Sequence, residues 1–266
     1  MKKNIILLGL FTGVIACHKV PITGRRQVSL VPESEMISLS LTSYKDFLTK
    51  NAPVADCDAE AQMGKYVGAK VSKAVVDYMR QKGLSSQLQG YKWEFNLVNN
   101  KEVNAWCMSG GKVVVYSGLL PVTQTETALA CVMGHEIAHA VARHGNERMS
   151  QGLIAQAGGV ALQVALAQKP QLTQSLLLQS YGVGSQLGML AYSRTQESEA
   201  DKLGLTFMAM AGYNPSEAVA FWERMSKASG GKAPLELLST HPSDTRRIAD
   251  IRAYLPTAMK YYKNPN

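Results

Sequence analysis

The stretch TQTETALACVMGHEIAHAVARHG, residues 123–145, decides the fold. Its apolar side chains recur every three or four residues, which is the period of an α-helix with one buried face. Thr123 and Glu126 form a Thr-x-x-Glu capping box, a pattern typical of the first turn of a helix. The sequence therefore predicts one helix that begins there and ends near Met149.

This stretch also contains a His-Glu-x-x-His pattern, formed by His135, Glu136 and His139. Residues four apart in a helix lie on one face, so both imidazoles can reach a single Zn²⁺ ion at about 2.0–2.1 Å. Glu136 then lies beside the ion, where it can hold a water molecule. Zinc lowers the pKa of such water from about 15.7 toward 7, so the carboxylate can take its proton at neutral pH. The alternative, two solvent-facing histidines, fits the apolar neighbours less well, because a buried polar cluster needs a partner such as a metal.

A third zinc ligand is required, and the acidic stretch ESEAD, residues 197–201, offers it on a helix predicted over residues 195–211. Glu197 and Asp201 are four residues apart and share a face, whereas Glu199 points elsewhere. Glu197 is the candidate ligand. Asp201 can accept the other ring N–H of a ligand histidine, which fixes the tautomer and orientation of that ring. The alternative is an ordinary solvated helix start.

The remaining chain is predicted to form more helices and a few strands. Alternating apolar and polar residues indicate a strand at residues 91–97, and the turn Ser109-Gly110-Gly111 indicates a hairpin between residues 103–108 and 113–116. Further helices are predicted at residues 33–49 and 58–81, twice within the apolar segment 152–190, and from residue 214 to about residue 229. The expected fold class is α+β, mostly helical with a small, mainly antiparallel sheet.

The N-terminus has the pattern of an export signal. Lys2 and Lys3 precede a short apolar run that ends in VIAC, residues 14–17, which resembles a bacterial lipobox. We therefore expect residues 1–16 to be a lipoprotein signal peptide and Cys17 to carry the lipid. The alternative is a plain signal peptide or a short buried helix. The expected division of the chain is residues 1–16 as the signal, 17–57 as a lipid-anchored segment with a helix, and 58–266 as the main domain.

Composition excludes several classes of protein. With 46% hydrophobic and 18% charged residues, the chain is neither disordered nor fibrous. The net charge of +8 comes from basic residues scattered between acids, without interleaved aromatic residues, so no nucleic-acid partner is expected. Cys57, Cys107 and Cys131 remain after Cys17, an odd number, and we expect no structural disulfide among them.

Together these motifs resemble the gluzincin zinc metallopeptidases, the family that includes the CAAX prenyl endopeptidases, HtpX and the mitochondrial OMA-type proteases. The chain is most similar to the lipid-anchored and periplasmic bacterial branch of LoiP and BepA-like proteases. The resemblance covers residues 60–255. The motifs that carry it are Asn104-Ala105-Trp106, the segment from His135 to Gly145, Glu197-x-Glu-Ala-Asp201, Thr240-His241-Pro242 and Arg247-Ile248.

The resemblance implies a role for each matching residue. His135, His139 and Glu197 correspond to the ligands of one zinc ion, Glu136 to the general base, and Asp201 to the partner of His135. The strand with Asn104, Ala105 and Trp106 corresponds to the edge strand that holds a substrate extended. His241 matches a histidine that can occupy the open position of the zinc ion and keep the enzyme latent. A role of His241 in stabilising the oxyanion stays open, with Arg247 as a competing candidate. His144 faces away from the zinc and packs or hydrogen-bonds.

The fold implied by the resemblance is a zincin similar to the minigluzincins, with the His-Glu-x-x-His pattern on the active-site helix. The implied function is a zinc metalloendopeptidase of unfolded or misassembled envelope proteins. Its expected location is the bacterial outer membrane, facing the periplasm, and its expected partners are extended proteins, the membrane through Cys17, and the machinery of outer-membrane assembly. Two alternatives stay open, a chaperone or binding module with a blocked zinc ion and a zinc amidase of the cell wall.

Overall fold

The computed structural model describes residues 17–20, 22–157, 170–181, 193–229, 237, 241 and 245–262. The predicted signal peptide, residues 1–16, lies outside this part of the chain, as do Thr240 and Pro242. The helices are α1 (Glu33–Lys50), α2 (Ala59–Gln81), α3 (Leu120–Thr123), α4 (Glu126–Val141), α5 (His144–Ala157), α7 (Pro170–Ser180), α8 (Arg194–Met210), α9 (Glu217–Ser229) and α11 (Thr245–Ala258), with 3₁₀ turns η1 (Ser85–Leu88), η2 (Ser117–Leu119) and η4 (Met259–Tyr261). The strands are β1 (Cys17–Lys19), β2 (Arg26–Val28), β3 (Glu94–Val98), β4 (Ala105–Met108) and β5 (Lys112–Tyr116). No helix in the described ranges is long and apolar enough to cross a lipid bilayer.

β5 is the central strand of a three-stranded sheet with the order β3-β5-β4. β4 and β5 pair antiparallel, as the predicted hairpin requires. β3 and β5 run parallel, with Glu94 opposite Lys112. The prediction of a mainly antiparallel sheet was therefore wrong in this detail, and the sheet is mixed. The chain reverses between β3 and β4 and again between β4 and β5, and β5, buried along its whole length, takes the centre.

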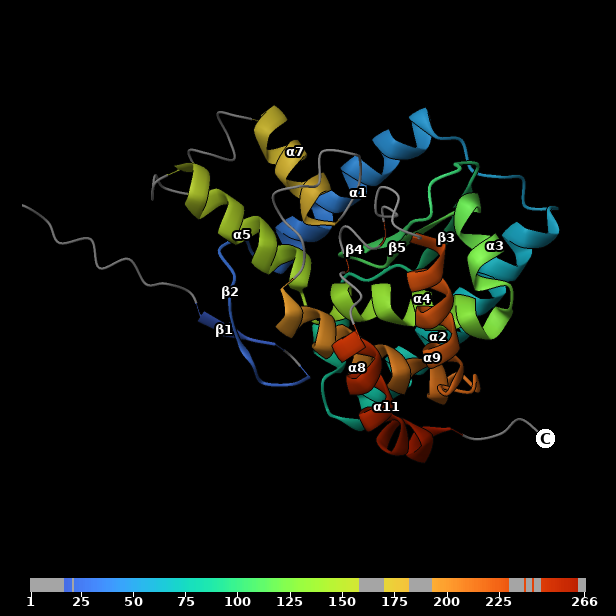
Figure 1. The fold of residues 1–266 in the computed structure, drawn as a ribbon. Coiled ribbons are helices and arrows are strands. Elements are labelled where there is room, and N and C mark those ends of the chain that lie inside the picture. The colour runs from blue at the N-terminus through green and yellow to red at the C-terminus, as the bar shows by residue number, and fades with distance from the viewer. Residues whose placement is uncertain are drawn as a thin grey trace, which may run out of the picture.

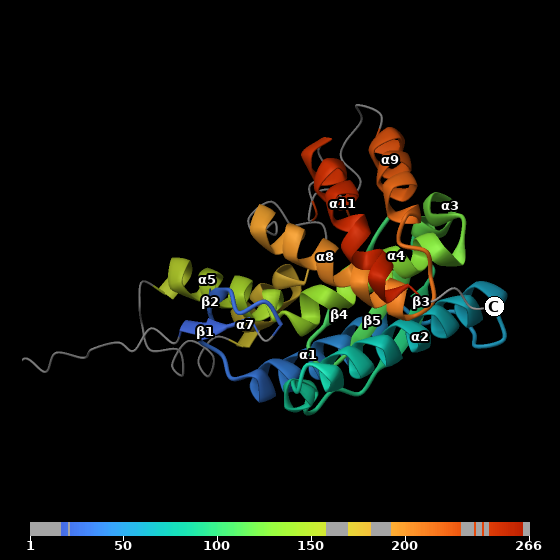
Figure 2. The same cartoon turned by 90° about the horizontal axis from the view of Figure 1, so that it is seen from below.

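Two hydrophobic cores lie on opposite faces of this sheet. In Figure 1, α1 lies above the sheet and α4 lies below it, and Figure 2 shows α2 and α8 on either side of α4. Alternate residues of β4 and β5 enter different cores, because side chains alternate along a strand. Cys107 and Val113 join the core of α2, α4 and α8, whereas Trp106 and Val114 join the core of α1, α5 and α7. The mostly helical α+β fold with a small sheet is confirmed.

The predicted long helix over residues 123–149 was wrong at both ends. Thr125 caps α4, and its side chain accepts a hydrogen bond from the Ala128 amide at 3.1 Å. Thr123 instead ends α3, where its hydroxyl donates to Leu120 O. Arg143 has a φ of 61°, a left-handed conformation that ends the helical path before α5 begins. The chain therefore turns soon after His139, and α5 begins at His144 in a new direction.

α4 and α8 approach each other through two glycines. A Cβ atom at Gly204 would lie 2.8 Å from the His135 amide nitrogen, and one at Gly134 would lie 2.9 Å from the Gly204 carbonyl oxygen. Only hydrogen atoms fit in this contact between the two backbones. The glycine pair therefore lets α8 lie close enough to bring its acidic residues to the histidines of α4.

We expect Gly204→Ala to lower the free energy of unfolding by about 1–3 kcal/mol, because the new methyl group forces two packed helices apart. Gly64→Ala on α2 is the matched control, since a Cβ there meets nothing within 4 Å. Chemical denaturation of both variants measures the difference. Equal stability of the two variants would contradict the close contact between α4 and α8.

Candidate metal centre

Four buried side chains converge where α4, α8 and the residues before α11 meet. They are His135 and His139 of α4, Glu197 of α8, and His241, each at most 5% exposed. One donor atom of each lies within 4.8 Å of the donor atoms of the others. The structure thus brings together the three ligands expected from the sequence and the histidine expected from the family resemblance.

The distances between the donor atoms suit a tetrahedral zinc site. His135 Nε2 lies 3.0 Å from His139 Nε2 and 3.1 Å from His241 Nδ1. Glu197 Oε1 lies 2.9 Å from His241 Nδ1 and 3.3 Å from His139 Nε2. Four ligands at about 2.0–2.1 Å from a zinc ion stand about 3.3 Å apart at the corners of a tetrahedron. Nitrogen and carboxylate donors are also the types that zinc prefers, so these residues fit one zinc ion.

The charges around the cluster favour a cation. Burial disfavours a charge on Glu197, but His241, Arg247 and His135 hold the pKa of its carboxyl well below the usual range. Burial and Arg247 also oppose a charge on His135, yet hydrogen bonds with Asp201 and Glu197 raise its pKa to about 9. Because metal ligands must be deprotonated, a metal ion that binds here takes the place of a proton on the ligand nitrogen of His135.

Asp201 and Arg247 form the outer layer on one side of the cluster. Asp201 Oδ1 lies 2.9 Å from His135 Nδ1, the ring nitrogen that faces away from the other donors. Arg247 binds Asp201 through two nitrogens, at 2.7 and 2.8 Å, and lies 2.9 Å from Glu197 Oε2. Its guanidinium also stacks on Trp222, 3.5 Å from the ring centroid. Asp201 thus lies where a partner of His135 is expected, and Arg247 holds both carboxylates.

Glu136 lies beside the cluster, and its Oε1 accepts no hydrogen bond from the described residues. The side chain of Glu136 is buried. The Nε2 atom of His241 lies 3.5 Å from Oε1. Burial raises the pKa of the Glu136 carboxyl above its usual value, against the opposing charges of His241 and His135. A carboxylate of this kind is suited to take and return a proton.

The sequence analysis missed the partner of His139. His144 Nδ1 lies 2.8 Å from His139 Nδ1, and His144 Nε2 lies 2.8 Å from Glu199 Oε2. His144 does hydrogen-bond, as expected, but its partner is one of the candidate ligands. Glu199 points away from the cluster, as expected, but it holds His144. The sequence did offer a signal for this contact, because His144 follows His139 closely and Glu199 lies two positions after Glu197.

Asn104, Ala105 and Trp106 belong to an edge of the sheet. β4 pairs only with β5 among the described strands, and Asn104 precedes it directly. Trp106 is fully buried and packs edge-on against Phe47, at 5.0 Å between ring centroids. The Leu237 amide donates to Val103 O at 3.1 Å, just before β4. Leu237, four residues before His241, therefore contacts the chain next to this edge strand.

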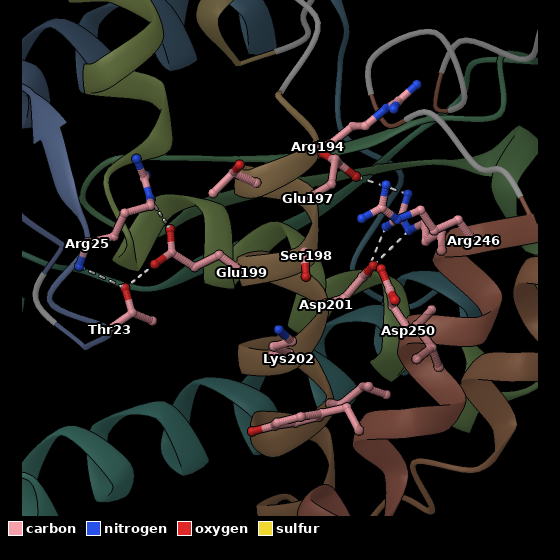
Figure 3. A pocket seen from close by; sticks show the side chains of 15 residues that line it. Thr23, Arg25, Arg194, Glu197, Ser198, Glu199, Asp201, Lys202, Arg246 and Asp250 are labelled. Carbon is pink, nitrogen blue, oxygen red and sulfur yellow. Dashed lines mark hydrogen bonds and ion pairs between the residues drawn. The ribbon is translucent and has the colours of Figure 1, made fainter.

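A cavity of about 500 Å³ lies on the outer side of α8, between the turn that carries Thr23 and Arg25 and helix α11. Figure 3 shows Glu199 pointing toward Thr23 and Arg25, and Asp201 pointing the other way, toward α11. Its lining also includes the side chains of Leu205, Ile251 and Tyr254 beside further polar residues of α8 and α11. Glu199 and Asp201 of α8 thus contact different elements on opposite sides: Glu199 contacts the β1–β2 turn, and Asp201 contacts α11.

The sequence is similar to a known peptidase family. The profile described as "Peptidase family M48" matches residues 68–255. Among curated proteins, the mitochondrial metalloendopeptidase OMA1 of Saccharomyces cerevisiae is 37% identical over 186 residues, which are 67% of this chain and 52% of the relative. The beta-barrel assembly-enhancing protease of Escherichia coli K12 is 33% identical over 168 residues, 60% of this chain and 34% of the relative. The mitochondrial metalloendopeptidase OMA1 of Bos taurus is 31% identical over 260 residues, 92% of this chain and 47% of the relative. The chain thus spans about half or less of the length of these relatives.

Proposed function

The chain belongs to peptidase family M48, and from this premise we propose that it is a zinc metalloendopeptidase that cleaves unfolded or misassembled proteins of the cell envelope. The observation that carries the proposal is the meeting of His135, His139 and Glu197, with Glu136 beside them. Three protein ligands and a neighbouring carboxylate are the parts that a zinc hydrolase requires.

Each residue has a defined task in this mechanism. His135, His139 and Glu197 would hold the zinc ion, which would act as a Lewis acid on the scissile carbonyl and lower the pKa of a bound water molecule to about 7. Glu136 takes the proton of the attacking water at Oε1, the oxygen without a hydrogen bond from any described residue, and passes it to the leaving amine. Asp201 holds the ring of His135 in one orientation. The backbone of β4 aligns an extended substrate by adding a strand to the sheet.

His241 acts as a latch in the proposed enzyme. Its Nδ1 lies among the donors, 2.9 Å from Glu197 Oε1, in the position that a catalytic zinc site leaves to water. Its ring also lies next to Glu136, so it takes the space between the base and the metal site. In this proposal the position of His241 corresponds to a closed state, and removal of its side chain opens the fourth position.

We expect His241→Ala to raise the rate of cleavage of unfolded protein by about tenfold or more, because the competent fraction of the enzyme rises. Arg246→Ala is the control, since this neighbouring side chain is exposed. The measurement is casein cleavage at equal zinc content. A lower rate in His241→Ala would assign His241 to the stabilisation of the intermediate. No cleavage with normal zinc content would support a binding module, and cleavage of peptidoglycan stem peptides alone would support an amidase.

A lipid anchor at Cys17 on the periplasmic side of the outer membrane completes the proposal. The lipobox-like sequence before Cys17 supports the anchor, and a relative named for the enhancement of beta-barrel assembly supports outer-membrane substrates and partners. We expect the wild-type protein to sediment with membranes and the Cys17→Ala protein to lose that association. Fractionation of cells that express each form measures this, and equal membrane association would contradict the anchor.

A further inference from the structure

A second chain of hydrogen bonds leads from the candidate metal centre to the N-terminal hairpin. His139 directs Nε2 at the other donors, and its second ring nitrogen, Nδ1, lies 2.8 Å from His144 Nδ1. His144 is fully buried, and its Nε2 lies 2.8 Å from Glu199 Oε2. The chain therefore has the order His139, His144, Glu199, and it joins residues of α4, α5 and α8.

The chemistry of imidazole fixes the proton positions along this chain. A histidine that binds a metal through Nε2 is neutral and carries its proton on Nδ1. The Nδ1–H of His139 therefore donates to Nδ1 of His144, which must be the acceptor. His144 then carries its own proton on Nε2 and donates it to Glu199. The hydrogen bond to Glu199 therefore holds the imidazole rings of His144 and His139 in one tautomer and one orientation.

Glu199 is held by the turn between β1 and β2. Thr23 donates its hydroxyl proton to Glu199 Oε1, and Arg25 Nε donates to Glu199 Oε2 at 2.9 Å. The two terminal nitrogens of Arg25 donate to the two carboxylate oxygens of Glu147 on α5, at 3.0 and 2.7 Å. The guanidinium of Arg25 thus joins the turn to α5 and α8, two of the three helices that carry the hydrogen-bonded chain, and Figure 3 shows its contact with Glu199.

The hairpin formed by β1 and β2 is small. β1 and β2 contain three residues each, and a two-stranded sheet of this size is marginally stable alone. Glu199 and Glu147 are buried carboxylates, and Arg25 donates to both and supplies the positive charge that compensates them. The contacts of Arg25 therefore hold Glu199 next to His144 and also attach the hairpin to α5 and α8.

We propose that Arg25 and Thr23, acting through Glu199 and His144, position the ring of His139 for metal binding, so that the N-terminal hairpin is part of the metal site. This inference rests on the proposed function, because it takes His139 as a ligand. Arg25 is a positioning residue and touches no reacting group. Loss of such an outer partner typically weakens metal affinity by about ten- to one hundredfold.

The test measures zinc affinity of the full chain by competition with a chromophoric chelator. We expect Arg25→Ala and Glu199→Ala each to weaken zinc binding by about ten- to one hundredfold. The zinc affinity of the double variant should equal that of the single variant with the lower affinity, because both residues act through the same hydrogen bonds. Arg25→Lys should restore part of the affinity. Arg26→Ala is the matched control, because Arg26 is the neighbouring exposed arginine of the same hairpin and should bind zinc like wild type.

Two further readouts separate positioning from general stability. The visible spectrum of the Co²⁺-loaded protein reports the ligand field, which Arg25→Ala should change and Arg26→Ala should not. Thermal unfolding without metal gives the purely structural effect. Unchanged zinc affinity and an unchanged cobalt spectrum in Arg25→Ala, with only a lower melting temperature, would overturn the inference and leave the proposed function intact. A wild-type chain that binds no zinc would overturn both.

Discussion

The Glu136→Gln protein is expected to keep one zinc ion per chain and to cleave unfolded protein about 100- to 10,000-fold more slowly than wild type, the range that a general acid–base residue contributes. Glutamine has the size and shape of glutamate, so the packing around the buried side chain is retained. Its amide cannot accept the proton of water. Glu136 is also outside the set of four convergent donors, and for this reason the metal should stay bound.

The decisive measurement for Glu136 is mass spectrometry of fragments from an unfolded outer-membrane protein, with zinc determined by elemental analysis of the same samples. Glu126→Gln is the control, because it makes the same chemical change at an exposed position of the same helix. Fragments should appear with wild type and with Glu126→Gln and be absent with Glu136→Gln. Full activity of Glu136→Gln would refute the assignment of Glu136 as the base.

The Glu197→Ala and His135→Ala proteins are expected to lose the metal. Each change removes one donor, and Glu197→Ala also leaves Arg247 with one carboxylate fewer in a buried site. Zinc affinity should fall further than the roughly ten- to one hundredfold that the loss of an outer partner costs. The two variants should also lose the stabilisation by zinc, since free zinc at 100 times its dissociation constant raises the free energy of unfolding of the wild-type protein by about 2.7 kcal/mol.

Elemental analysis after dialysis, and thermal unfolding with and without added zinc, measure the loss of the metal. Lys202→Ala is the control, because Lys202 is exposed on the same helix as Glu197. Wild type and Lys202→Ala should unfold at higher temperature when zinc is added, and the two ligand variants should not respond. A zinc-dependent shift of wild-type size in Glu197→Ala would remove Glu197 from the ligand set.

Local spacing made part of the site predictable. His135 and His139, and likewise Glu197 and Asp201, are four residues apart within single helices, and helix geometry alone places each pair on one face. The hairpin of β4 and β5 was predictable for a similar reason, since two glycines with φ of 86° and 82° form its turn. Such features depend only on residues close together in the sequence, so a short segment is enough to predict them.

The position of His144 shows where this reasoning failed. In one continuous helix, a residue five positions beyond His139 is rotated by about 140° from it, and would face away from the cluster. The left-handed conformation of Arg143 ends the helix first, and α5 then brings His144 back to the other nitrogen of His139. Arginine has no special preference for that conformation, so its occurrence depends on contacts made elsewhere in the fold.

The sequence by itself determined the peptidase family, through motifs that resemble it, and the pairs His135/His139 and Glu197/Asp201, because the spacing of each pair is fixed within a single helix. The tertiary structure alone decided the central position of β5 and the series of hydrogen bonds from His139 through His144 and Glu199 to Arg25. These contacts join residues separated by as many as 174 positions. Such pairs are selected by the packing of whole helices, and α8 reaches α4 only because Gly134 and Gly204 let the two backbones touch.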